Sequence, residues 1–151
     1  MADDRLERAI EEMVRIPPIL QRKLHRGLFK VVFEEVGADI APHHMMIMKM
    51  IQESGPLSSS EIGETLSIAK SQMTHSVDKL IELGMVEREH GTEDRRRIRI
   101  SLTDKGRSML EKVDKTINNH LKEKLAILSD DELEKLAESF RYIAEKFSQL
   151  Q

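Results

Sequence analysis

Residues 57–106 read LSSSEIGETLSIAKSQMTHSVDKLIELGMVEREHGTEDRRRIRISLTDKG, and this stretch decides the fold. Near its start, Glu61 follows Ser58 by three residues. A hydroxyl and a carboxylate at this spacing can satisfy the free backbone donors of a helix N-terminus, an arrangement called a capping box. The pattern therefore predicts that a short helix begins here. Three residues at helical spacing would form its apolar face, Leu57, Ile62 and Leu66.

A second helix is predicted after a short turn at residues 67–69. It would begin at residue 69 or 70, because Ala69 stands where a capping Ser or Thr is usual, and end at Leu83. Gly84 is suited to follow it, since glycine adopts the left-handed backbone of a helix cap without steric cost. Two helices joined by such a turn predict a helix-turn-helix. The inward side of the second helix would consist of Met73, Val77, Leu80 and Ile81.

The outward side of this second helix carries the groups that hydrogen-bond base edges in a DNA major groove. It comprises Lys70, Ser71, Thr74, His75 and Asp78, with Gln72 and Lys79 on its flanks. One interpretation is a solvated polar face, which any surface helix has. The other is a recognition helix, in which Ser71, Gln72, Thr74 and His75 contact bases and Lys70 and Lys79 contact phosphates.

A β-hairpin is predicted next. Residues 85–89 would form its first strand and residues 90–94 its turn. Residues 97–102 alternate Arg, Ile, Arg, Ile, Ser, Leu, which is the period of a half-buried strand. Ile98, Ile100 and Leu102 are expected to point inward, and Arg97 and Arg99 outward.

Arginines gather at the tip of this hairpin. Arg95 and Arg96 lie at or just past the turn, and Arg97 opens the second strand. Beside a helix-turn-helix, such a cluster can enter a minor groove or bind phosphates. The alternative is a cluster of ion pairs with Glu93 and Asp94. Both are possible together, because one arginine can be held by Asp94 while another reaches DNA.

The stretch resembles the winged helix-turn-helix of the MarR family, the multiple-antibiotic-resistance-type transcriptional regulators. The residues that carry the resemblance are Leu57, Glu61, Ile62 and Leu66; Leu80, Leu83, Gly84, Met85, Val86 and Arg88; and Asp94, Arg95 and Arg96, followed by Leu102, Thr103 and Gly106. The spacing from the Asp-Arg-Arg run to the Leu-Thr-x-x-Gly motif is the one the family shows. Length and helix order extend the resemblance more weakly to the whole chain.

Helices are also predicted on both sides of this stretch. Residues 3–16 have an apolar stripe, and Pro17 and Pro18 should interrupt this helix with a kink or a restart, because proline lacks a backbone donor and disfavours helix in the residue before it. A second helix is expected over residues 19–36. A third, rich in methionine, should open at Pro42 and run to about residue 53.

Two more helices are predicted after the hairpin. Thr103 should cap one that extends to about residue 128, and Ser129 with Glu132 forms a second capping box for the last, over residues 130–150. The apolar residues of the last helix recur at alternating steps of three and four, a pattern typical of helix–helix packing.

The predicted fold class is mainly α with a small β-hairpin wing, in one domain over residues 1–151. Residues 41–107 would form the winged helix-turn-helix. Residues 1–36 and 108–151 would be dimerisation helices, since they exceed what one small winged domain needs. A C2 homodimer would present two recognition helices to a pseudo-palindromic site.

The composition excludes several classes. There is no cysteine, hence no disulfide or thiol redox centre, and no zinc finger is expected. No run of about eighteen apolar residues predicts a membrane span, and the acidic N-terminus is unlike a secretory signal, so a cytoplasmic protein is expected. The net charge is −3, but residues 69–107 hold nine Lys and Arg against seven Asp and Glu. This asymmetry suits a DNA-facing region.

The function that the resemblance implies is sequence-specific regulation of transcription on double-stranded DNA, as a homodimeric repressor. No catalytic constellation, cofactor site or metal site is predicted, so no enzyme is expected. The resemblance also implies release from DNA by a small, often aromatic anion, which Arg22, Arg26 and His43 would pair against Met46. Two alternatives stay open: a metal-responsive regulator using His25, His43, His44 or His120, and a winged helix that binds a protein partner.

Overall fold

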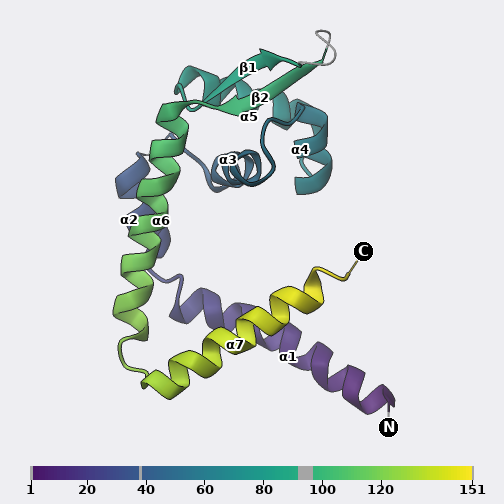
Figure 1. Cartoon of the computed structure of the whole chain (residues 1–151), viewed down its shortest axis with the longest axis vertical. Helices are drawn as coiled ribbons and strands as arrows, with labels where there is room; N and C mark the ends of the chain where they lie inside the picture. Colours follow the sequence, from purple (N-terminus) through teal and green to yellow (C-terminus); the bar gives the residue numbers. More distant parts are fainter. Residues whose placement is uncertain (1, 38, 92–96, 151) are drawn as a thin grey trace. The chain divides into compact units, whose positions relative to one another are not determined.

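A computed structural model describes residues 2–37, 39–91 and 97–150 (Figure 1). The described residues form seven helices and one antiparallel hairpin, so the predicted fold class is confirmed. The chain divides into two units, Met1–Leu28 with Ile117–Gln151, and Phe29–Thr116. The elements are α1 (Ala2–Lys23), α2 (Leu28–Val36), α3 (Pro42–Ser54), α4 (Ser59–Leu66), α5 (Lys70–Glu82), β1 (Val86–His90), β2 (Ile98–Leu102), α6 (Asp104–Leu125) and α7 (Asp130–Phe147).

The predicted restart of the helix at the two prolines is wrong. Helix α1 continues through Pro17 and Pro18 to Lys23. Proline removes the bond to the carbonyl four residues earlier, but Met13 and Val14 are exposed, so water can bind those carbonyls, and the φ angle fixed by proline is itself helical. The break comes instead at Gly27, whose φ of 84° lies in the left-handed region.

The first unit leaves much of its apolar surface exposed. Helix α7 contains no buried residue, although its predicted capping box is confirmed by two hydrogen bonds between Ser129 and Glu132. The exposed apolar side chains of α1 and α7 are Leu6, Ile10, Met13, Val14, Ile16, Phe140, Tyr142, Ile143 and Phe147. Within the described part of the chain, neither helix has the amount of apolar burial that would normally stabilise it.

The second unit has the hydrophobic core. Helix α3 contacts α4 and β2, α5 contacts α4 and β1, and the two strands pair with each other (Figure 1). The core is formed by Ile40, Ile47, Met48, Ile51, Ile62, Met73, Val77, Leu80, Met85, Val86, Ile100, Leu102 and Leu110. The Met-rich helix therefore supplies packing, with Met48 fully buried.

The hairpin register pairs Val86 with Leu102 at its base and His90 with Ile98 at its outer end. The base is buried, but Ile98 is 50% exposed, so it does not reach the core as expected. Ile98 has the same side-chain direction as Ile100 and Leu102, yet it lies where the hairpin has passed the edge of the core. Strand alternation predicts direction and not depth.

Leu57 also departs from the expectation that it belongs to the first helix. It precedes α4 and forms a bridge with Ile100, in which its N–H donates to the Ile100 carbonyl at 3.2 Å and its carbonyl accepts at 2.7 Å. The start of α4 is thereby attached to the hairpin.

The Leu-Thr-x-x-Gly motif joins α6 to the end of α5. The Thr103 hydroxyl accepts the Gly106 N–H at 3.0 Å, which confirms the predicted cap, and donates to the Gly84 carbonyl at 2.6 Å. A Cβ on Gly106 would overlap the Met85 carbonyl oxygen, so only glycine fits at this crossing. Helix α6 ends at Leu125, three residues before the predicted end. Of the helices described, none is long and apolar enough to cross a bilayer.

Candidate nucleic-acid interface

The helix-turn-helix begins with the predicted capping box. The Ser58 N–H donates to the Glu61 carboxylate at 2.7 Å, and the Glu61 N–H donates to the Ser58 hydroxyl at 3.2 Å. These bonds lower the pKa of Glu61, and the positive charges of Arg99 and Arg97 lower it further. The capping box therefore fixes the residue at which α4 begins.

The predicted turn lies between Leu66 and Lys70, the residues that end α4 and begin α5. Ser67 adopts the left-handed conformation, with φ 54° and ψ 40°, and it is the one described residue other than glycine with a positive φ. The Ile68 N–H donates to the Gly63 carbonyl at 2.8 Å and closes the end of α4. This turn sets the angle between the two helices.

The inward side of α5 holds it against the core. Met73, Val77 and Leu80 are buried, as predicted, and so is Ser76. Ser76 was missed because its hydroxyl reads as polar surface, although its position between Met73 and Val77 indicated the inner side. Helix α5 ends in a Schellman arrangement, in which the N–H groups of Gly84 and Met85 donate to the carbonyls of Ile81 and Leu80, both at 2.9 Å.

The outward side of α5 gathers most of the predicted DNA-contacting residues. Those that are exposed are Lys70, Ser71, Gln72, Thr74 and His75. The Thr74 hydroxyl donates to the Lys70 carbonyl at 3.1 Å, which leaves its lone pairs free to accept a hydrogen bond. Lys79 differs, because it is half-buried and its ammonium lies 3.5 Å from the Glu82 carboxylate.

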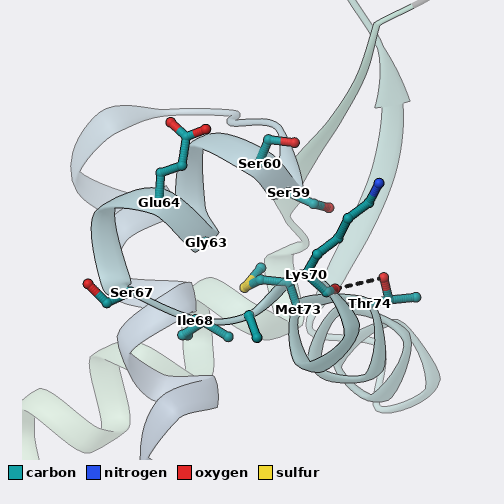
Figure 2. Close-up of a pocket in the computed structure, with 10 residues that line it drawn as sticks. Ser59, Ser60, Gly63, Glu64, Ser67, Ile68, Lys70, Met73 and Thr74 are labelled. Atoms are coloured by element: carbon teal, nitrogen blue, oxygen red, sulfur yellow. Dashed lines mark hydrogen bonds between the residues drawn. The ribbon is translucent and has the colours of Figure 1, made fainter.

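Residues of α4, of the turn and of the start of α5 line an open cavity of about 590 Å³ (Figure 2). Gly63, Ile68, Ala69 and Met73 give it an apolar part. The rest of the lining is polar and consists of Ser59, Ser60, Glu64, Ser67, Lys70 and Thr74. Figure 2 shows the Lys70 side chain extending away from α5, while its backbone carbonyl accepts the hydrogen bond from the Thr74 hydroxyl. A cation and hydroxyls beside the first turn of a recognition helix are the groups that contact a DNA backbone.

The wing is joined to α5 by an ion pair. The Arg88 guanidinium on β1 lies 2.6 Å from the carboxylate of Asp78 on α5. Arg97 is exposed, and its carbonyl accepts the Gly91 N–H at 2.8 Å, beyond the last strand pair. The predicted contacts of Arg95 and Arg96, and their alternative pairing with Glu93 and Asp94, lie outside the described residues.

The predicted effector residues are divided between the two units. Arg22 and Arg26 are exposed in the first unit, while α3 of the second unit carries half-buried His43 and exposed Met46. Their combination into one site therefore stays a prediction. In the part of the chain that the structure describes, no three His, Asp or Glu residues are grouped as a metal site would require.

His44, beside His43, has a structural role that the sequence did not indicate. Its Nδ1 accepts the Ala41 N–H at 3.1 Å and so caps α3. Burial lowers the pKa of His44, and the neighbouring His43 and Lys79 lower it further. The neutral imidazole is the form that can accept this bond.

Comparison with known proteins agrees with this geometry. The MarR family model matches residues 40–98. The uncharacterized HTH-type transcriptional regulator YkoM of Bacillus subtilis is 31% identical over 108 residues, covering 68% of this chain and 70% of YkoM. A MarR-like transcriptional regulator of Thermotoga maritima is 30% identical, with a TM-score of 0.63 over 74% of this chain and 79% of its own.

A MarR family protein of Bacillus stearothermophilus matches almost the whole fold, with a TM-score of 0.80 over 95% of this chain and 98% of its own at 22% identity. The residues that the family model matches include α3, α4, α5 and β1. The chain belongs to the MarR family, whose members are DNA-binding transcriptional regulators and not enzymes.

Proposed function

We propose that the protein is a homodimeric repressor that reads a pseudo-palindromic operator. The observation that carries this proposal is the exposed polar side of α5, which rests on a buried inner side. Ser71, Gln72, Thr74 and His75 would contact bases, and Lys70 and Lys79 phosphates. At the wing, Arg95, Arg96 and Arg97 would contact the minor groove or the backbone.

The exposed apolar surface of α1 and α7 supports a dimer. Side chains such as Leu6, Ile10, Phe140 and Phe147 are each about half exposed. Burial of exposed apolar side chains is energetically favourable. The same surface on a second copy of the chain would bury them in a symmetric dimer. Residues 1–36 and 108–151 would then be dimerisation helices, and residues 41–107 the DNA-binding part of one domain.

A repressive role is supported by one relative. The HTH-type transcriptional repressor MdtR of Bacillus subtilis is 34% identical over 74 residues, about half of each chain. Release from DNA by a small ligand is the regulation we propose, with Arg22, Arg26 and His43 pairing an aromatic carboxylate against Met46. Calorimetric titration with salicylate-like acids tests it: the absence of heat, together with unchanged DNA affinity across a panel, would exclude this effector class.

Selection from a random duplex library tests DNA recognition. We expect enrichment of a two-fold symmetric motif with half-sites about ten base pairs apart. Thr74→Ala should weaken binding to that motif more than to random duplex. Failure to enrich any sequence, with no salt-dependent affinity for duplex DNA, would favour a winged helix that binds a protein partner. Enrichment only after addition of a transition metal would favour a metal-responsive regulator.

A further inference from the structure

Arg99 lies on β2, next to the backbone bridge between Ile100 and Leu57. The two hydrogen bonds of that bridge attach the strand to the residue just before the α4 capping box. The Arg99 Nη1 donates to the Pro56 carbonyl at 3.4 Å. The side chain is therefore directed toward the start of the first helix of the helix-turn-helix, not toward the tip of the wing.

The positive charge of Arg99 is available to a ligand. Arg88 and Arg107 of the same unit lie 2.6 Å and 3.0 Å from the carboxylates of Asp78 and Asp104. Across the described ranges, by contrast, the exposed Arg99 forms no ion pair within 4.0 Å, although Glu89 is its partner in the strand register. A guanidinium has five N–H donors, and the carbonyl contact uses one of them.

The Glu61 carboxylate is a group that the positive charge of Arg99 affects. Its carboxylate is held by Ser58 at the first turn of α4, and it is close enough to Arg99 and Arg97 for both to lower its pKa, after the larger effect of the Ser58 hydrogen bonds. Arg99 of β2, and Arg97 just before that strand, therefore act on the carboxylate at the first turn of α4, where backbone N–H groups also favour an anion.

We propose that Arg99 binds a phosphate of the DNA backbone where the wing meets the start of α4, an inference that rests on the DNA binding proposed above. A guanidinium matches two phosphate oxygens at once, and the Pro56 carbonyl limits its rotamers before DNA arrives. Because phosphate contacts carry no base information, Arg99 would fix how the wing and α4 lie on the backbone, and its removal would weaken binding to all duplexes alike.

The test measures DNA affinity against salt concentration for the full chain, on the duplex enriched by selection and on a random duplex of equal length. Arg99→Ala should reduce the slope of log affinity against log salt by about 0.9 for each phosphate that the protein no longer neutralises. Affinity should fall on the order of tenfold on both duplexes. Arg99→Lys, which keeps the charge, should keep most of the slope.

The matched control is Lys30→Ala, which removes an exposed cation from α2 of the same unit and should leave the slope unchanged. A normal slope in Arg99→Ala would overturn the proposal, and a lowered melting temperature with that normal slope would assign Arg99 a purely structural role. If the unsubstituted protein shows salt-dependent binding in the same experiment, only the Arg99 contact has failed. If it shows none, the proposed function fails, and this inference with it.

Discussion

The Arg88 guanidinium on the wing and the Asp78 carboxylate on the recognition helix lie 2.6 Å apart and form the ion pair that joins these two elements. Both side chains are about half exposed, 47% and 56%, so water screens the pair. Its contribution to the free energy of unfolding should be below about 1 kcal/mol. Its larger effect should be on the orientation of the wing relative to α5.

Asp78→Asn should therefore change DNA recognition while leaving the stability of the fold almost unchanged. The amide keeps the shape of the side chain but loses the charge that attracts Arg88. We expect a melting temperature close to that of the unsubstituted protein and a smaller ratio of affinities for the selected and the random duplex. Asp104→Asn is the control, because it breaks an exposed ion pair with Arg107 at 3.0 Å that does not connect the wing to α5. Equal ratios in both variants would contradict the role of the pair.

Gly106→Ala should destabilise the second unit. A methyl group there would overlap the Met85 carbonyl oxygen, and backbone cannot move aside as a side chain can. The expected loss is about 1–3 kcal/mol in the free energy of unfolding, despite the better helix propensity of alanine. Urea denaturation measures it, with Ser108→Ala on the exposed side of the same helix as control. An unchanged midpoint would show that α6 can shift without cost.

The two capping boxes allow a matched comparison. Ser58→Ala and Ser129→Ala each remove a hydroxyl that accepts an N–H at the start of a helix, at 3.2 Å and 3.3 Å. Each should cost about 0.5–2 kcal/mol of stability. Only Ser58→Ala should also weaken DNA binding, because α4 supports the recognition helix. Equal losses of DNA affinity in both variants would indicate that α7 contributes as much to binding as α4 does.

The parts of the fold that could be predicted are those held by hydrogen bonds between residues close together in the sequence. Both capping boxes, the cap at Gly84 and the bond from the Gly106 N–H to Thr103 act through neighbours three residues away, so they are visible in the sequence. The bond from the Thr103 hydroxyl to the Gly84 carbonyl spans 19 residues and is not. The continuation of α1 through Pro17 and Pro18 depends on exposure to water, which spacing does not reveal.

The contacts between elements that form the site could not be predicted from the sequence, for a related reason. Asp78 and Arg88 read as two surface charges on different elements, and the burial of Ser76 and the exposure of Ile98 depend on where the core ends. His44 read as one of six histidines, and its bond to Ala41 requires the backbone geometry at the start of α3.

His44 predicts a dependence of stability on pH. Its pKa in the folded protein lies below the usual 6.5, chiefly because it is buried, so the unfolded chain binds a proton more readily than the folded one. Stability is therefore complete above about pH 6.5 and declines as pH falls toward the folded-state pKa. Protonation also removes the Nδ1 lone pair that accepts the Ala41 N–H.

The measurement is the free energy of unfolding by urea from about pH 8 to about pH 5, a range in which few groups other than histidine titrate. His44→Gln is the informative variant, because glutamine can cap α3 at the same position but does not titrate. Its stability should vary less with pH than that of the unsubstituted protein. His75→Gln, on the exposed side of α5, is the control for replacing a histidine by glutamine. If His44→Gln and the unsubstituted protein lose stability in parallel, protonation of His44 does not cause the loss.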